Sequence, residues 1–416
     1  MKKYLVVALS SIIIACSGPK KTMNIVEFTT QLTPNSSRKV SSTEFRNVRN
    51  FGNMLDYINS HSGIELEDIQ NIRYSKTTSF SGKLQSIPLN VDKYIYTLTQ
   101  DGKVYSFDLE AKKLAWQTSI DPKTGASESG SISYSEGYLY VVSDLYIYKI
   151  DASAGKIREK ALLDDITRDY PLISNKVIYI KTASNKMAAY RTSDLVQIWH
   201  YQTWSDNVST STYSSPLIDG NSVFAGFSTG QVISSNIADG SEIWQINLTK
   251  DSSDPLGSSP ADLSTHAILN NHNLYLPSSS GFLIKLAISN AGLVWKTQAE
   301  DIISMTLAGD LFITNNARQL ASISSQDGSV IWTTNLLKDK ENVRDAKSTI
   351  FTPPLVSNLG IFVFGRDGVG YLVNRQNGDM IKKFSIPNKV SSFIVYKGKV
   401  ILFDEKSAYE LIQGKK

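Results

Sequence analysis

Few residues in this sequence have side chains that could carry out chemistry by themselves. Cys16 is the only cysteine among 416 residues, which excludes an internal disulfide, a cysteine-based zinc site and an iron–sulfur cluster. The four histidines show no spacing typical of metal ligands: His61, His200, His266 and His272. Spacing indicates no Ser/His/Asp set, phosphate-binding loop or pair of catalytic carboxylates. The residues therefore predict no metal, no cofactor and no enzyme.

The surroundings of Cys16 indicate that its thiol carries a lipid. Lys2 and Lys3 precede an apolar run, residues 4–14, that is too short to span a bilayer and fits a signal peptide. The run ends in Ile-Ile-Ala-Cys, which resembles the lipobox of bacterial lipoproteins. We therefore expect a lipoprotein signal peptide over residues 1–15 and lipidation of Cys16, with a plain signal peptide as the alternative. No Asp follows the cysteine, so we expect anchoring in the outer membrane of a Gram-negative bacterium, facing the periplasm.

Charge and composition place the rest of the chain among globular proteins. Hydrophobic residues make up 41% and charged residues 20%, which excludes a disordered chain. A formal net charge of +4 is too small for this length to indicate a nucleic-acid partner. The segment after the cysteine is rich in Ser, Thr, Asn and Lys and has no period. We therefore interpret residues 16–62 as the lipidated cysteine and a polar tether.

A motif that ends in tryptophan recurs through the remaining chain. Asn-Ile-Ala-Asp-Gly-Ser-Glu-Ile-Trp at 236–244 and Ser-Ser-Gln-Asp-Gly-Ser-Val-Ile-Trp at 324–332 are two copies. The motif closes at Trp116, Trp199, Trp244, Trp295 and Trp332. Two weaker copies close at Glu159 and Lys382, and the copies lie about 44 residues apart. We expect the five tryptophans to dock neighbouring repeats, since an indole buries much area and its N–H can reach a carbonyl.

Each repeat predicts four short strands, the content of one propeller blade. Seven copies are complete, and three more strands are expected within residues 391–412. A segment on the N-terminal side of the first repeat, residues 69–76 with Tyr74 in the tryptophan position, would supply the missing strand and remove an open sheet edge. The sequence thus predicts an all-β fold: an eight-bladed β-propeller of four-stranded antiparallel blades over residues 63–416, closed by an N-terminal strand that joins the last blade.

The repeat, the lipobox and the tether together resemble the BamB family of outer-membrane lipoproteins, whose propellers carry repeats of the pyrroloquinoline-quinone (PQQ) type. The resemblance implies a non-enzymatic scaffold for the assembly of outer-membrane β-barrel proteins. It implies binding to the POTRA region of the barrel-forming subunit through rim loops, with unfolded outer-membrane proteins as a further partner. On the two central connectors, we expect partner binding at Trp204, Asp206, Asp262 and Leu263. Residues 258–265 occupy the place of an acidic segment in the family, and Asp262 is the position that the resemblance carries over, whereas Trp204 is singled out because it lies outside the motif.

Other interpretations of the same features are open. The repeat is shared with PQQ-dependent dehydrogenases, which need a cofactor pocket, a Ca²⁺ site and a catalytic carboxylate. A lipoprotein propeller that binds peptide or polysaccharide on its rim is a further alternative. Trp204 is either an exposed interface anchor or packed under its loop. Asp251, Asp254 and Asp262 are either an acidic patch or separate solvated carboxylates.

Overall fold

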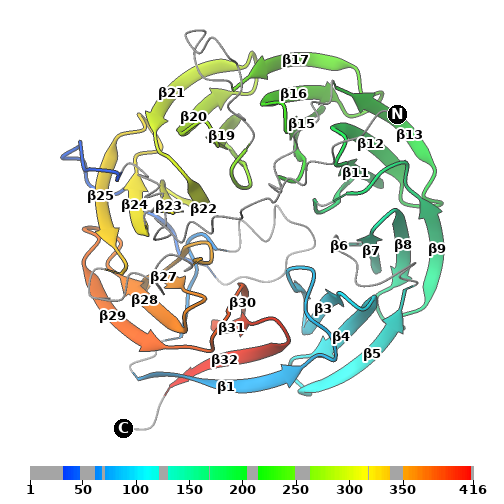
Figure 1. The fold of residues 1–416 in the computed structure, drawn as a ribbon, viewed down its shortest axis with the longest axis horizontal. Coiled ribbons are helices and arrows are strands. Elements are labelled where there is room, and N and C mark those ends of the chain that lie inside the picture. The colour runs from blue at the N-terminus through cyan, green and yellow to red at the C-terminus, as the bar shows by residue number, and fades with distance from the viewer. Residues whose placement is uncertain are drawn as a thin grey trace, which may run out of the picture.

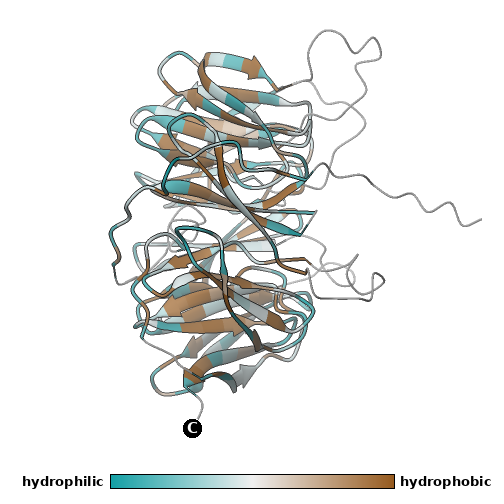
Figure 2. Ribbon diagram, turned by 90° about the vertical axis from the view of Figure 1, so that its left-hand side faces the viewer, coloured by the Kyte–Doolittle hydropathy of each residue, from teal (hydrophilic) through white to brown (hydrophobic). Residues whose placement is uncertain are grey.

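The computed structural model describes residues 31–46, 61–67, 71–120, 130–167, 169–203, 214–248, 263–316, 318–337 and 350–413. Within them the chain forms eight four-stranded antiparallel sheets, or blades, arranged in a ring (Figure 1). Seen from its side, the ring is a flattened disc (Figure 2). The all-β, eight-bladed prediction is confirmed. None of the described residues forms a helix long and apolar enough to cross a bilayer.

Blades one to seven follow one another along the chain, each with its first strand nearest the centre and its fourth outermost (Figure 1). Blade one holds β2 (Leu89–Val91), β3 (Tyr94–Thr99), β4 (Lys103–Asp108) and β5 (Lys113–Ser119), and blade two holds β6 (Gly130–Ser135), β7 (Tyr138–Ser143), β8 (Tyr146–Asp151) and β9 (Ile157–Leu162). Blade three holds β10 (Leu172–Ser174), β11 (Val177–Lys181), β12 (Lys186–Arg191) and β13 (Gln197–Gln202). Blade four holds β14 (Leu217–Asp219), β15 (Ser222–Gly226), β16 (Gln231–Asn236) and β17 (Glu242–Asn247). Blade five holds β18 (Ile268–Asn270), β19 (Asn273–Ser278), β20 (Phe282–Ala287) and β21 (Gly292–Gln298). Blade six holds β22 (Ile302–Ala308), β23 (Asp310–Asn315), β24 (Gln319–Ile323) and β25 (Val330–Asn335). Blade seven holds β26 (Leu355–Ser357), β27 (Gly360–Phe364), β28 (Val369–Val373) and β29 (Met380–Ser385).

Burial along the strands follows from packing blades side by side. The second and third strands have a neighbouring blade on both faces, so strands such as β23 are buried at every residue. The outer strands have solvent beside them, and β17 alternates between exposed and partly buried residues. The core therefore lies between blades, in the aliphatic and aromatic side chains of the middle strands.

The indole of every tryptophan at the end of the motif reaches the next blade. Each Nε1–H donates a hydrogen bond to a backbone carbonyl in that blade's last turn. The pairs are Trp116 to Ala152 (2.9 Å), Trp199 to Ile237 (3.0 Å), Trp244 to Ile288 (2.8 Å), Trp295 to Ser325 (3.2 Å) and Trp332 to Arg375 (3.0 Å). An aromatic ring of the same blade's second strand packs beside the indole, as Tyr179 does 5.9 Å from Trp199. The indole thus fills the space between two blades and pairs a turn carbonyl.

The glycine of the motif is required by the turn and by this docking indole. Gly240 has φ +75°, a conformation that L side chains rarely adopt. A Cβ placed on it would lie 2.5 Å from Cε3 of Trp199 in the preceding blade. Glycine is therefore the residue that lets one blade's turn lie against its neighbour's indole.

Blade eight is built from both ends of the domain. It holds β30 (Ser392–Tyr396), β31 (Lys399–Phe403) and β32 (Ser407–Gln413), with β1 (Ile72–Ser79) paired antiparallel to β32 as its outer strand. The closing N-terminal strand is thus confirmed, although it covers residues 72–79 instead of 69–76.

The aromatic residue of this strand is not where the motif predicted it. In blade one, Trp116 pairs with Ser106 of the third strand. In blade eight, the equivalent third-strand residue, Glu410, pairs with Ser75. The prediction that Tyr74 takes the tryptophan position is therefore wrong by one residue. Pairing along β32 sets the register, and a slip of one residue turns a side chain to the other face of the sheet.

Charged groups lie at the junction between blades eight and one. Glu110 of blade one accepts from Lys397 Nζ at 2.5 Å and from the Tyr396 hydroxyl at 3.0 Å. Glu410 lies 3.9 Å from Lys112 of blade one. Partly exposed ion pairs thus lie at this junction, whereas five of the other junctions carry a docking indole.

Part of the predicted polar tether is packed against the ring. Residues 31–46, which we call the N-terminal strap, lie beside β25 (dark blue in Figure 1). The Asn35 N–H donates to Val330 O at 2.9 Å, and Asn35 Oδ1 accepts from the Val330 N–H at 2.6 Å. Val40 is buried at 7% exposure. The interpretation of residues 16–62 as a polar tether therefore does not describe the strap, because hydrogen bonds to a strand far along the chain hold it without any apolar period.

Candidate partner-binding face

The two faces of the ring carry different loops. Because successive strands run in opposite directions, every connector from one blade's outer strand to the next blade's inner strand emerges on one face, which we call the connector face. The turns between first and second and between third and fourth strands lie on the other, the turn face. The longest connectors are 203–216, 248–267 and 336–354. The first two flank blade four, so two long loops leave the connector face side by side.

Four of the five residues predicted for lipidation or partner binding lie outside the described residues. These are Cys16, Trp204, Asp206 and Asp262. Lipidation of the first and partner contact by the others stay predictions. Leu263 is the one predicted partner-binding residue that the structure places.

Leu263 lies at the base of the second long connector, with its side chain buried at 2% exposure. It forms an antiparallel bridge with Ser278 of blade five, and the next N–H, of Ser264, donates to Pro277 O at 2.8 Å. A Cβ on Gly226 of blade four would lie 2.5 Å from Leu263 Cδ1. In this structure Leu263 therefore fixes the end of the connector, and its contact with a partner stays a prediction.

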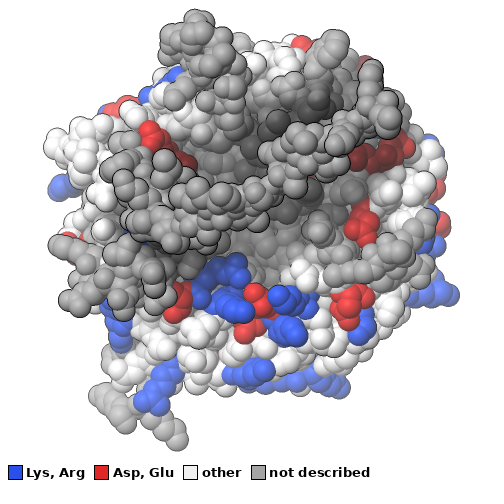
Figure 3. All heavy atoms as spheres, viewed as in Figure 1, with Lys and Arg blue, Asp and Glu red and all other residues white. Residues whose placement is uncertain are grey.

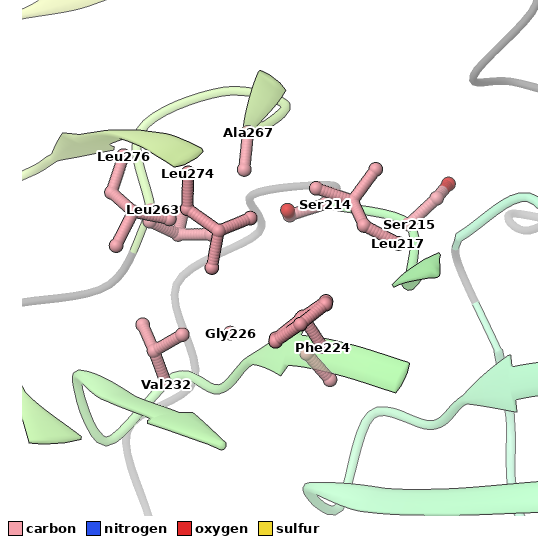
Figure 4. Close-up of a pocket in the computed structure, with 11 residues that line it drawn as sticks. Ser214, Ser215, Leu217, Phe224, Gly226, Val232, Leu263, Ala267, Leu274 and Leu276 are labelled. Carbon is pink, nitrogen blue, oxygen red and sulfur yellow. The ribbon is translucent and has the colours of Figure 1, made fainter. Parts of the chain in front are cut away.

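The Leu263 side chain lines a small, mostly apolar hollow between blades four and five (Figure 4). The hollow is lined by Leu217, Phe224, Val232, Ala267, Leu274 and Leu276, among others. Burying one leucine side chain is worth about 1.5–3 kcal/mol. The base of this loop is thus held by packing into both blades that it joins.

A buried polar cluster lies next to the same connectors. Lys181 Nζ is 3.1 Å from Asp169 Oδ2 and donates to Gly226 O at 2.9 Å, which ties blade three to its preceding connector and to blade four. The two charged side chains are 9% and 5% exposed. His266, in the second long connector, is partly buried and lies near enough to Lys181 to feel its charge. Its burial, with the positive charge of Lys181, lowers its pKa to about 4, so it is neutral at pH 7. A buried ion pair that joins blades three and four therefore lies close to the second long connector.

Sequence reasoning missed this cluster because its members come from separate repeats. The available signal was Lys181 itself, which ends the apolar strand β11 with a charge and faces a neighbouring blade. A lysine at such a position is costly to bury unless it is paired.

A second charged cluster lies on the connector face, over blades seven and eight. Glu405 is surrounded by three cations, with Arg366 and Lys389 at 3.5 Å and Lys83 at 3.6 Å. Figure 3 shows Lys and Arg atoms gathered on the lower part of this face, where β30 to β32 lie. Sequence reasoning missed this cluster too, since its four members come from four different turns and connectors.

The connector face offers a surface for binding, and the buried ion pair and hydrogen bonds described above join neighbouring blades. Among the residues that the structure describes, no three or more His, Cys, Asp or Glu side chains come together in a way that could hold a metal ion. The paired charges described above are used to hold blades and connectors in place.

Comparison with known proteins connects the fold to a family. A family model described as outer membrane protein assembly factor BamB matches residues 100–334. An uncharacterised protein of Rickettsia conorii is 29% identical over 85% of this chain and 84% of its own length. Outer membrane protein assembly factor BamB of Yersinia pestis is 24% identical over 74% of this chain and 79% of its own length.

Solved structures share the ring. The crystal structure of BamB from Moraxella catarrhalis has a TM-score of 0.67 at 17% identity, covering 82% of this chain and all of that one. Quinohemoprotein alcohol dehydrogenase from Comamonas testosteroni has a TM-score of 0.68 at 10% identity, covering 88% of this chain and 81% of that one. These likenesses show the fold, and the family model matches more than half of the chain. The chain therefore belongs to the BamB family of outer membrane protein assembly factors.

Proposed function

We propose that this protein is a non-enzymatic scaffold of the machinery that assembles β-barrel proteins in the outer membrane. It is held to the inner leaflet of that membrane by lipid on Cys16 and faces the periplasm. The connector face binds a POTRA domain of the barrel-forming subunit through the loops that flank blade four. Family membership carries this proposal, and the two adjacent long connectors of the described ring support its location.

The physical argument for a scaffold is preorganisation. Leu263 fixes the end of the second long connector, and Ser215, whose Oγ accepts from the Tyr170 N–H at 3.1 Å, ties the end of the first to the preceding connector. Loops that leave a rigid base lose less entropy on binding than loops that are free at both ends. Unfolded outer-membrane proteins are a second partner in this proposal, recruited once the barrel-forming subunit is in place.

The test is a binding titration with the isolated POTRA region of the barrel-forming subunit from the same organism. Asp262→Lys reverses one charge on the connector face, and we expect it to weaken binding about tenfold. Asp379→Lys makes the same charge change on the turn face and serves as the matched control. No binding by the wild-type chain, or equal binding by both variants, would contradict the proposed interface.

The alternative is a quinoprotein, because quinoprotein dehydrogenases share the ring. It is separated by adding PQQ and Ca²⁺ to the purified chain. A bound quinone spectrum with dye reduction in the presence of an alcohol would support a dehydrogenase, and free quinone after gel filtration would support the scaffold.

A further inference from the structure

The N-terminal strap shows how the outer corner of a blade can hold an extended segment. At the last turn of blade six, Arg38 Nε lies 3.2 Å from Asp327 Oδ2. Two residues later, Val40 packs in the same cluster as Ile331 of β25, which is only 8% exposed. The corner therefore binds a cation and an aliphatic side chain placed two residues apart on an extended chain.

Blade four carries the same corner without an occupant among the described residues. Asp239 and Asp327 each precede the docking tryptophan by five residues, and Ile243 corresponds to Ile331. The local geometry matches as well. In blade four, the Ser241 N–H and hydroxyl donate to Asp239 Oδ1 at 3.0 and 2.7 Å, and in blade six the equivalent serine donates to Asp327 Oδ1 at 3.1 and 2.8 Å.

The two corners differ in what covers them. Ile243 is 51% exposed, whereas Ile331 under the strap is 8% exposed. The second carboxylate oxygen of Asp239 has no hydrogen-bond or ion-pair partner among the described residues, whereas that of Asp327 holds Arg38. Blade four thus presents the carboxylate and the isoleucine of this corner uncovered, with Ala238 where blade six has Gln326, whose Oε1 accepts from Arg38 Nη1 at 2.6 Å.

The other turns lack this combination. The equivalent residues are neutral in blades one, two, five and seven: Ala111, Ala154, Asn290 and Asn377. Blade three has Asp194, but Arg191 Nη2 lies 3.0 Å from its Oδ2. Of these seven turns, all within the described residues, blade four alone combines a carboxylate with an open oxygen and an exposed isoleucine.

The negative charge at this corner favours a positively charged ligand. Glu242, next to Ile243 in the chain, is exposed and adds a second negative charge to this strand, with its Oε2 accepting from the Tyr201 hydroxyl of blade three at 2.8 Å. We propose that the outer corner of blade four binds an extended segment of a partner protein that carries Arg or Lys two residues before Val, Ile or Leu. The corner opens on the turn face and the outer wall of the ring, away from the connector face. The inference therefore does not depend on the proposed POTRA contact, and both surfaces can be occupied together.

The test uses the full chain and a probe taken from its own strap. A fluorescein-labelled peptide of residues 31–41 is titrated with the protein and followed by anisotropy. We expect binding that Ile243→Ser weakens about tenfold, through lost apolar burial. Asp239→Asn keeps the turn acceptor and removes the charge, so it weakens binding about threefold at low salt and not at high salt.

Matched controls come from blade five and from the peptide. Val294→Ser removes an aliphatic side chain of similar exposure, 47%, from a corner whose turn has Asn290, and leaves binding unchanged. A peptide with Arg38→Glu and Val40→Ser does not bind. Both protein positions are at the surface, so the variants fold, which a thermal melt verifies.

Three outcomes would overturn the proposal. One is binding that is the same in Ile243→Ser, Asp239→Asn and the wild type. A second is binding that increases in Asp327→Asn, because the peptide then displaces the strap from blade six. The third is a concentration-dependent dimer that Ile243→Ser abolishes, which would identify the strap of a second copy as the occupant.

Discussion

At the scale of single residues, the ring depends on pairs in which one residue is defined by another in the next blade. The docking indoles and the glycines of the last turns are such pairs. Gly155, Gly328 and Gly378 lie against Trp116, Trp295 and Trp332 as Gly240 lies against Trp199. Each has a positive φ and lies too close to an indole for any Cβ. The repeat was visible in the sequence because these constraints favour Gly in four of the turns, although Lys112, Leu195 and Ala291 take the same position in blades one, three and five with positive φ.

The cost of crowding can be separated from the cost of φ. Gly137 has φ +84° with open space around its Cα, whereas Gly240 has φ +75° with the Trp199 ring beside it. We expect Gly137→Ala to lower the free energy of unfolding by about 1–2 kcal/mol through φ strain alone. Gly240→Ala loses about 1–3 kcal/mol more through overpacking. Urea denaturation measures both, and equal losses would mean that the indole moves aside without cost.

Two buried histidines make stability depend on acid. Burial lowers the pKa of His61 to about 3, and burial with Lys181 lowers that of His266 to about 4, both from 6.5. Between pH 6.5 and these values the unfolded chain binds protons that the folded chain does not. Stability therefore falls as pH drops through this window, by up to about 1.4 kcal/mol per pH unit for each histidine. Urea titrations from pH 7.5 to 4.5 measure the slope.

His266→Gln should flatten this slope, since one of the two proton-linked groups is gone. The exposed His200 provides the control, because His200→Gln removes a histidine without removing a buried group. A slope unchanged in His266→Gln would show that this histidine is not kept neutral by the fold.

At the scale of elements, the sequence predicted strands well and the strap not at all. Alternating apolar residues and turn glycines mark each blade, so the blades were predictable one by one. The strap has no such pattern. Its position depends on the two hydrogen bonds between Asn35 and Val330, and on Leu32 and Val40, which are buried against blade six. These contacts link residues almost 300 positions apart in the chain and cannot be inferred from local spacing. The buried cluster around Lys181 escaped prediction for the same reason.

The strap should be released by a single side-chain change. Asn35→Ala leaves the Val330 N–H without its acceptor, a loss of about 1–3 kcal/mol at one end of the segment. We expect faster amide exchange at Val330 and Ile331 and faster proteolysis within residues 31–46, with little change in global unfolding. Ser37→Ala, an exposed neighbour, is the control. Unchanged exchange in Asn35→Ala would show that apolar contacts alone hold the strap.

At the scale of the whole molecule, the ring is closed by pairing strands from opposite ends of the described chain. β1 and β32 pair over seven positions. The number of blades and the use of an N-terminal strand followed from counting repeats. The register at the seam did not, because Tyr74 was placed by residue type, whereas pairing along β32 decides which side chain faces the next blade.

Two truncations separate the strap from the seam. A chain that begins at residue 47 lacks the strap but retains β1, and we expect a cooperative thermal melt at a lower temperature. A chain that begins at residue 80 lacks β1 and exposes the edge of β32, together with the apolar Leu411. We expect it to aggregate or to melt without cooperativity. Size-exclusion chromatography and circular dichroism distinguish the two, and a monomeric, cooperative second chain would show that the seam is dispensable.

The shared eighth blade also sets an order for folding. Residues 72–79 are among the first of the ring to leave the ribosome, yet their partner strand consists of residues 407–413, almost the last. Each of the other blades can form from neighbouring residues, whereas β1 must remain unpaired until the entire ring has been synthesised. Pairing of β1 with β32 thus closes the longest loop of the ring, and we expect it to be the slowest pairing step in folding. A chain that stops before β32 cannot complete the ring, so β1 is paired only in chains that contain all eight blades.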